Sequence, residues 1–295
     1  MRIAAIDIGS NAARLLIKEV TRCKNGHTEF TKLNLLRIPL RLGMDVFSFG
    51  EIREEREEMM LRTMNIFSDL MDMYKVEHYR ACATSAMRDA ANGDDIRKKV
   101  KTRSGISIEI ISGDEEAALI YENQIAETLD DHFGYLYIDV GGGSTELMYF
   151  ENGKMKYKRS FNIGTIRLLK NLVPEEQWHL LKSEIKENIN KKNIIGIGSG
   201  GNINKIASLS KTKEGKTLSL NALKKYHEEL SRMTVPERMH HYQLREDRAD
   251  VLVPALEIYT KVMSWADISN ILVPKISVAD GLIHSIYNQL NNNKN

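Results

Sequence analysis

The chain has 295 residues, 42% of them hydrophobic and 28% charged, which is typical of a soluble globular protein with room for two domains. Its 42 basic and 40 acidic residues leave a net charge of +2, which excludes a global field that would recruit nucleic acid or a membrane. No apolar run approaches the length that spans a bilayer, and the first apolar run contains Asp7, which a secretory signal would not carry. Cys23 and Cys82 form no disulfide framework or metal-ligand spacing, so we expect a cytoplasmic protein with reduced thiols.

The N-terminal residues 2–20 predict a strand, a tight turn and a second strand, with a third strand near 30–38. The turn is Gly9-Ser10-Asn11, and Asp7 stands just before it. Because glycine has no Cβ, backbone N–H groups at such a turn can come close to an anion. The turn is therefore a candidate phosphate site.

Two arginine segments follow. Residues 37–44 are predicted as a loop that carries Arg37 and Arg41, and a short strand at 79–84 leads to Arg88 at a helix start. The planar guanidinium suits phosphate oxygens, and α/β sheets place ligands at the carboxyl ends of strands. Surface ion pairs explain Arg37 and Arg41 equally well. Between these segments, the methionine stripe of an amphipathic helix at 51–74 predicts core packing.

A helix that opens at Ser112 and runs to about Leu129 begins with adjacent acids. Ser112 and Glu115 have the spacing of a capping box, which gives Glu115 a structural role. Neighbouring helical residues point to different faces, so Glu116 is the better candidate for an acid or base in a cleft. The helix dipole also favours acids at this position, and helix physics alone favours this structural explanation for both Glu115 and Glu116.

The turn Gly141-Gly142-Gly143-Ser144 repeats the N-terminal device, since Asp139 precedes it and Glu146 follows it between two apolar runs. Asp139 lies 132 positions after Asp7, about one domain length. Two copies of one strand-turn-strand device predict two related lobes. Carboxylates at the edges of the turn suit a hard cation such as Mg²⁺, and an ordinary glycine-rich hairpin is the alternative.

Two further segments downstream resemble these sites. Gly164 precedes Arg167, which lies in a predicted first helical turn after a strand at 154–161. A third glycine turn, Gly198-Ser199-Gly200, joins a strand at 194–197 to a helix and can present N–H groups to phosphate or ribose. It lacks the Gly-Lys-Ser/Thr ending of a P-loop. The last predicted elements are a helix at 249–262 interrupted at Pro254, and a closing helix at 282–290 after Asp280-Gly281.

Four ordered motifs, at residues 6–11, 83–90, 111–117 and 138–146, together resemble the exopolyphosphatase/guanosine pentaphosphate phosphohydrolase (Ppx/GppA) family. Residues 245–251 resemble the Arg-Ala-Asp-Val segment of that family, so the likeness covers nearly the whole chain. It implies an α/β fold, the duplicated ribonuclease H-like (actin-like) fold, with two lobes and a cleft between them. The lobes are expected at 1–122, with the C-terminal helix 281–295 packed back on it, and at 123–280.

The resemblance implies that the protein releases terminal phosphate from inorganic polyphosphate or the 5′ phosphate of pppGpp, with Mg²⁺. The catalytic base of the family falls on Glu116, while Asp139 and Glu146, with Asp7, match its metal partners. The implied phosphate-binding residues are Asp7, Gly9, Ser10, Asn11, Arg41, Arg88, Gly141, Gly142, Gly143, Ser144, Arg167, Gly198, Ser199 and Gly200.

Two other functions stay open on the sequence: a kinase of the same fold for a small acceptor, and a non-catalytic binder of guanosine penta- or tetraphosphate. Two departures from the family pattern are expected to matter. The chain looks like a short, two-domain form, and the C-terminal Gly-Leu-Arg-Glu-Gly pattern becomes Gly-Leu-Ile-His-Ser, with Ile283 and His284 in place of Arg and Glu. By analogy with the family, pairing into a homodimer is also an expectation.

Overall fold

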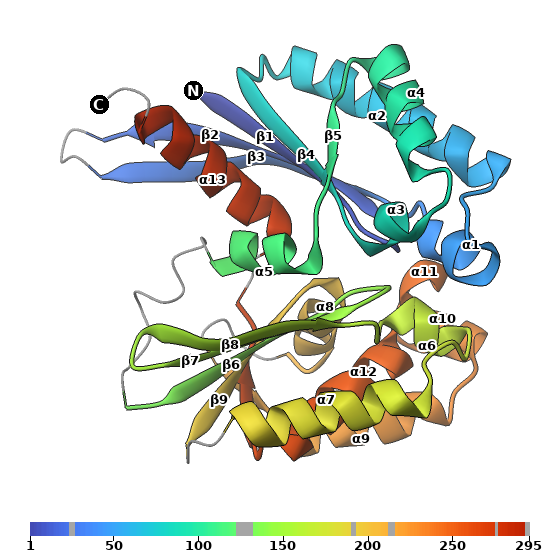
Figure 1. Ribbon diagram of the computed structural model, residues 1–295, viewed down its shortest axis with the longest axis vertical. Helices are drawn as coiled ribbons and strands as arrows, with labels where there is room; N and C mark the ends of the chain where they lie inside the picture. The colour runs from blue at the N-terminus through green and yellow to red at the C-terminus, as the bar shows by residue number, and fades with distance from the viewer. Residues whose placement is uncertain (24–26, 122–131, 190–192, 212–215, 275–276, 293–295) are drawn as a thin grey trace. The chain divides into compact units, whose positions relative to one another are not determined.

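The structure is a computed structural model that describes residues 1–23, 27–121, 132–189, 193–211, 216–274 and 277–292 (Figure 1). The chain forms two compact units, one of Met1–Asn123 with Ser277–Asn295 and one of Gln124–Ile276. Within the described residues, no helix has both the length and the apolar content that crossing a bilayer requires.

The first unit is built on a five-stranded sheet with the strand order β3-β2-β1-β4-β5. Strands β1, β2 and β3 form an antiparallel meander, and β4 and β5 continue the sheet parallel to β1. The strands are β1 (Arg2–Ile8), β2 (Ala13–Arg22), β3 (Thr28–Ile38), β4 (His78–Ala83) and β5 (Ile108–Ile110). The helices are α1 (Leu42–Phe49), α2 (Glu54–Met73), α3 (Ser85–Asp89), α4 (Gly93–Ser104), α5 (Gly113–Tyr121) and α13 (Val278–Asn292).

The second unit repeats this topology. Its sheet has the order β10-β11-β9-β6-β7-β8, in which β6, β7 and β8 form the meander and β9 and β11 follow parallel to β6. The strands are β6 (Gly134–Val140), β7 (Thr145–Glu151), β8 (Lys154–Phe161), β9 (Ile194–Ser199), β10 (Thr217–Ser219) and β11 (Asn270–Leu272). The helices are α6 (Thr165–Leu169), α7 (Glu175–Asn188), α8 (Gly201–Leu209), α9 (Leu220–Ser231), α10 (Val235–His241), α11 (Glu246–Ala249) and α12 (Leu252–Trp265). The shared strand order confirms the predicted duplication of a ribonuclease H-like α/β fold.

Helices cover both faces of the first sheet. Along β1, alternate residues Ala4, Ile6 and Ile8 join a core with α2 and α4, and the methionine stripe of α2 is buried there as predicted. The C-terminal helix α13 packs across β1, β2 and β4 (Figure 1). Because successive residues of a strand point to opposite faces, α13 takes the side that β1 presents with Ile3 and Ala5.

The structure corrects three details of the predicted elements. The segment expected as a loop contains α1, which begins after Arg41, buries Leu42 and Val46, and ends at Gly50 with a φ of 79°. Helix α13 begins at Val278, so Asp280 and Gly281 lie inside it. The predicted interruption at Pro254 falls earlier, between α11 and α12, because proline is tolerated in the first turn of a helix. The predicted end of the helix near Leu129 lies outside the described residues.

Close backbone packing explains why α13 carries a glycine. A Cβ added to Gly281 would stand 1.8 Å from the carbonyl oxygen of Leu119, so α13 and α5 touch at their backbones. An ion pair of 2.7 Å between Lys18 of β2 and Asp280 holds the start of α13. Gly281 therefore has a packing role in this chain, although the residues after it differ from the family pattern.

His284, one of the two departures, is a packing residue of α13. Its ring stacks on Phe30 of β3 at 4.4 Å between centroids, and Tyr287 hydrogen-bonds Thr28 one turn later. Burial, and then the positive charge of Lys18, lower the pKa of His284 below its ordinary value of 6.5, although Asp280 opposes this shift. The folded chain therefore holds a neutral imidazole.

This environment predicts a pH dependence of stability. Because the unfolded chain binds a proton to His284 more readily than the folded chain, its contribution is fully present above pH 6.5 and is lost as the pH falls through the lowered pKa. We expect the midpoint of thermal unfolding to fall between pH 7.5 and pH 5.5, and His284→Phe to reduce that slope while keeping the stacking on Phe30. An equal slope in both proteins would contradict this role of His284.

Candidate active site

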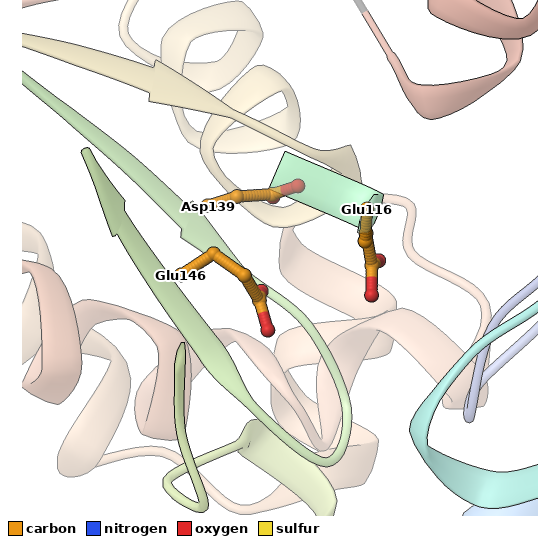
Figure 2. Close-up of side chains that lie close together, drawn as sticks. All are labelled: Glu116, Asp139 and Glu146. Carbon is orange, nitrogen blue, oxygen red and sulfur yellow. The ribbon is translucent and has the colours of Figure 1, made fainter. Parts of the chain in front are cut away.

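Two buried carboxylates face each other in the second unit. Asp139, near the end of β6, pairs in register with Glu146 of β7, so their side chains lie on the same face of the hairpin (Figure 2). Their side chains are 8% and 2% exposed, and each offers a ligand oxygen within 4.8 Å of the other. Glu146 also accepts a hydrogen bond of 2.9 Å from the Ser160 hydroxyl. Buried like charges at this separation repel each other unless a cation or proton offsets them, and carboxylate oxygens are the ligands that Mg²⁺ prefers.

The glycine turn beside these acids is braced by the start of α6. The Gly141 N–H donates to Ser144 O at 2.9 Å, and the Gly141 and Gly142 carbonyls accept from the N–H groups of Thr165 and Ile166 at 3.0 and 2.8 Å. Arg167 donates through Nε to the Gly143 carbonyl at 2.8 Å. The predicted residues Gly141, Gly142, Gly143 and Ser144 thus form one turn, and Arg167 is bound to it. The three bonds from Thr165, Ile166 and Arg167 each orient a carbonyl of the turn toward α6.

Gly164 allows this close contact. A Cβ at position 164 would lie 2.4 Å from Gly142 O and 2.4 Å from the Gly143 carbonyl carbon, so Gly164→Ala must displace the turn. We expect this variant to lose about 1–3 kcal/mol of stability and much of its activity. Urea unfolding followed by circular dichroism measures the first effect.

Gly9→Ala is the matched control for stability, because its Cβ would stand at an ordinary 3.6 Å from Ala12 O in the corresponding turn of the first unit. It should unfold near the wild-type midpoint. Equal unfolding midpoints for Gly164→Ala and Gly9→Ala would contradict the prediction, because they would show that the Gly141–Ser144 turn accommodates the added Cβ without loss of stability.

The third predicted turn lies against Asp139. Gly200 has a φ of 93°, and a Cβ there would stand 2.7 Å from Asp139 Oδ1. Beneath it, the Tyr259 hydroxyl donates to Ser199 O at 2.8 Å and to Ile138 O at 3.3 Å. Burial, and then the charge of Asp139, raise the pKa of Tyr259 well above its ordinary value of 10, which keeps the hydroxyl protonated. Tyr259 therefore holds the ends of β6 and β9 together.

The first unit carries the matching turn, but the acid before that turn, Asp7, forms an ion pair. Asp7 is 3% exposed, and its Oδ2 accepts from Arg14 Nη1 at 2.7 Å across the β1–β2 hairpin. The Gly9 N–H donates to Ala12 O at 3.0 Å. The Arg14 guanidinium balances the charge of Asp7, so the structure gives Asp7 a different environment from that of Asp139.

Helix α1 braces this turn as α6 braces the other. The carbonyls of Ser10 and Asn11 accept from the N–H groups of Gly43 and Arg41 at 2.9 and 3.0 Å. The Ser10 hydroxyl bonds that of Ser85 at 2.8 Å, which ties the turn to α3. Arg41 stands before α1 with a φ of 53°, so the turn and the predicted arginine belong to one local structure.

Glu116 lies in the β5–α5 segment of the same unit, and Arg88 of α3 binds that segment. Arg88 donates to the Ile111 carbonyl at 2.8 Å, and this bond fixes the entry to α5. The predicted capping box is confirmed, because the Glu115 N–H donates to Ser112 Oγ at 3.1 Å and the Ser112 N–H to Glu115 Oε2 at 2.7 Å. Glu115 is thereby committed to the helix start. The half-buried Glu116 lies on the next face of α5 and is labelled in Figure 2.

Sequence reasoning missed three contributors to these sites. Ser160 orients Glu146, Tyr259 lies under the third turn, and Arg248 reaches Asn202 Oδ1 at 3.5 Å at the start of α8. Serine, and tyrosine within an apolar helix, carry no distinctive local signal. Arg248 lies in the segment that resembles the family, which was the available indication of its importance.

A family comparison covers most of the chain, including the second and third turns. The model of the Ppx/GppA phosphatase family matches residues 19–290. A solved exopolyphosphatase structure from Cytophaga hutchinsonii is similar with a TM-score of 0.82 and 25% identity, over 99% of this chain and 98% of that one.

The chain is also similar to three curated proteins, and the match covers a different share of the length of each. The bifunctional 3-dehydroquinate synthase/phosphatase of Fusobacterium nucleatum is 34% identical over 63% of this chain, which covers 30% of that protein. The guanosine-5′-triphosphate,3′-diphosphate pyrophosphatase of Vibrio vulnificus is 31% identical over 59% of this chain, covering 34% of that protein. Exopolyphosphatase 1 of Mycobacterium tuberculosis is 23% identical over 96% of this chain and 87% of its own length. The chain thus spans about a third of the first two proteins and most of the third.

Proposed function

The chain belongs to the Ppx/GppA phosphatase family, and from this premise we propose that it hydrolyses phosphoanhydride bonds. Its substrates are inorganic polyphosphate, from which it releases the terminal phosphate, or pppGpp, from which it releases the 5′ phosphate. The observation that carries the proposal is the buried Asp139–Glu146 pair beside a glycine turn braced by α6. An apolar pair would pack at these positions at least as well as two buried carboxylates, so packing alone does not explain them.

The donor set of Asp139 and Glu146 fits a hard divalent cation, and these two residues would hold Mg²⁺. The chemistry supplied by Mg²⁺ at such a site is neutralisation of the negative charge on phosphate oxygens. Asp7 is the third residue proposed for the metal, although its carboxylate is paired with Arg14. The pairing makes Asp7 the weakest of the three proposed ligands.

Phosphoryl transfer to water needs a placed nucleophile and charge stabilisation more than covalent help. We assign the base to Glu116, which takes a proton from the attacking water. Glu116 suits this part because its neighbour Glu115 already supplies the cap of α5. The water oxygen then bonds the terminal phosphorus as the bridging oxygen leaves with the shortened chain.

The remaining predicted residues are proposed to position phosphate. The turns at Gly9 to Asn11 and at Gly141 to Ser144 present backbone N–H groups to terminal phosphates. Arg41 and Arg167 stand at the helices that brace these turns, and Arg88 stands at the entry to α5. We propose that the three guanidinium groups attract the anionic substrate chain toward the turns. The turn of Gly198, Ser199 and Gly200 contacts Asp139 and is assigned to the leaving-group side.

Phosphate release with Mg²⁺ from long polyphosphate, tripolyphosphate, pppGpp and ATP, measured in parallel with malachite green, tests the proposal. Release from polyphosphate or pppGpp without any acceptor supports it, and the ratio of those rates identifies the preferred substrate. Release that depends on an added alcohol or carboxylate would indicate a kinase. Tight guanosine nucleotide binding without turnover in any arm would indicate a non-catalytic binder, and either result overturns the proposal.

A further inference from the structure

The two buried acids belong to a row of four polar side chains that crosses the sheet of the second unit. Asp139 of β6 is in register with Glu146 of β7 on one side and with Ser199 of β9 on the other. Glu146 is in turn in register with Ser160 of β8. Residues in register on neighbouring strands lie on the same face of a sheet, with the strands about 4.8 Å apart. The order across the sheet is therefore serine, acid, acid, serine.

At one end of this row the serine orients its acid. The Ser160 hydroxyl donates to Glu146 Oε1 at 2.9 Å. Ser199 has the equivalent position beside Asp139, and it is 1% exposed. The backbone of Ser199 is fixed from α12, because the Tyr259 hydroxyl donates to Ser199 O at 2.8 Å. The Ser199 side chain therefore starts from a fixed point next to Asp139.

Tyr137 lies directly behind the row. Strand residues two positions apart share a face, so Tyr137 stands beside Asp139 along β6 and diagonal to Ser199. Burial, and then the negative charge of Asp139, raise the pKa of Tyr137 well above its ordinary value of 10, and the nearby Ser199 hydroxyl opposes this shift. Tyr137 is 2% exposed, so it brings a second buried hydroxyl to the same group.

Neither of these two hydroxyls has a hydrogen-bond partner among the residues that the structure describes. A buried hydroxyl without a partner destabilises a fold, and phenylalanine would fill the space of the Tyr137 ring without that penalty. Tyr149 has a buried hydroxyl of the same kind, but it packs on Gly134 at the other end of β6, where the acid that acts on it is Glu151. Tyr137 and Ser199 therefore differ from Tyr149 in standing beside Asp139.

We propose that Tyr137 and Ser199 are positioning residues that orient the Asp139 carboxylate for a divalent cation, an inference that rests on the metal site of the proposed function. A hydroxyl accepts one hydrogen bond and donates another. Tyr137 donates to Ser199 Oγ, and Ser199 donates to the Asp139 carboxylate. Ser199 reaches both partners by rotation of its side chain, which leaves the backbone in place. Asp139 is then oriented from β9 as Glu146 is oriented from β8.

Calorimetric titration of the full chain with Mg²⁺, together with thermal unfolding without metal, tests the proposal. Tyr137→Phe should weaken Mg²⁺ binding by about tenfold or more, as is usual when a group that orients a metal ligand is lost. The unfolding midpoint of this variant without metal should equal or exceed that of the wild type, because the change removes an unpartnered hydroxyl and keeps the ring. A tyrosine with a structural role alone would change the midpoint and leave the affinity unchanged.

Tyr149→Phe is the matched control. It removes the same group from the same sheet, at a position away from Asp139, and its Mg²⁺ affinity should equal that of the wild type. An equal loss of affinity in Tyr137→Phe and Tyr149→Phe would overturn the proposal, and so would an unchanged affinity in Tyr137→Phe.

A double variant tests the order of the relay. Ser199→Ala should weaken Mg²⁺ binding at least as much as Tyr137→Phe does. Because Tyr137 acts through Ser199, the double variant Tyr137→Phe/Ser199→Ala should bind Mg²⁺ no more weakly than Ser199→Ala alone. Losses that multiply in the double variant would show independent roles and overturn the relay.

Phosphate release by the wild type separates this inference from the proposed hydrolase. Mg²⁺-dependent release together with an unchanged affinity in Tyr137→Phe overturns this inference alone. A weakened affinity in Tyr137→Phe, in a wild type that binds Mg²⁺ but releases no phosphate, supports this inference and overturns the hydrolase. A wild type that binds no Mg²⁺ overturns both the inference and the metal site on which it rests.

Discussion

Replacing Glu116 with Gln is expected to lower the rate of phosphate release by about 10²- to 10⁴-fold, the usual contribution of a positioned general base. Gln keeps the size and polarity of the side chain but cannot accept a proton from water. The loss should appear in kcat, with little change in KM, because substrate contacts are proposed to lie in the turns. Steady-state phosphate release from the preferred substrate measures it.

The neighbouring acid provides a matched control. Glu115→Gln retains a side-chain oxygen that can accept the Ser112 N–H, so the capping box and α5 should survive and activity should stay near the wild-type level. Near-normal phosphate release by Glu116→Gln would show that another group is the base. Equal losses in both variants would point to a disturbed start of α5 instead.

Removing one charge from the buried pair is expected to stabilise the metal-free chain and to weaken the stabilisation that Mg²⁺ provides. Without metal, Asp139→Asn should unfold at a higher temperature than the wild type, because it relieves the repulsion between Asp139 and Glu146. With Mg²⁺ at 100 times its dissociation constant, the wild type should gain about 2.7 kcal/mol, and the variant should gain much less. Thermal unfolding at increasing Mg²⁺ concentration measures both the stability difference without metal and the gain on binding. Calorimetric titration gives the dissociation constant of the metal.

Asp45→Asn is the control for this experiment. Asp45 is a buried acid of the first unit whose carboxylate is paired with Arg56 at 2.6 Å and with the Arg53 N–H at 3.1 Å. Its loss should destabilise the chain equally with and without Mg²⁺, since Arg56 loses its partner in both cases. If Mg²⁺ stabilises Asp139→Asn as strongly as the wild type, Asp139 and Glu146 do not hold the metal.

Local chemistry made much of the architecture predictable. An apolar run, an acid, a glycine turn and a second apolar run occur twice, and both copies fold as the β1–β2 and β6–β7 hairpins. Ser112 and Glu115 form their capping box, and Met60, Met64 and Met71 of α2 are buried. These features depend on residues a few positions apart, whose backbone geometry is fixed by alternation, helical period and turn chemistry.

Contacts that depend on the assembled sheet and its helices were not predictable in the same way. The bracing of each turn by a helix start, the ion pair of Asp7 with Arg14, and the position of Gly200 against Asp139 each required the sheet and its register. A single sequence does not specify which carbonyl an N–H will meet in a distant turn, as the N–H of Thr165 meets Gly141 O and that of Gly43 meets Ser10 O. Gly164 is an example. Only the folded structure shows that a Cβ at this position would collide with the Gly142 carbonyl.

The amino-acid sequence by itself thus determined the duplicated hairpins, the acids at their edges and the separate position of Glu116 on a helix. Tertiary structure decided which acids share an environment. Asp7 and Asp139 stand at the same place in the repeat, yet the first is neutralised by Arg14 and the second faces Glu146. The physical reason is the residue across the hairpin: a guanidinium offsets a buried carboxylate, whereas a second carboxylate creates the demand for a cation.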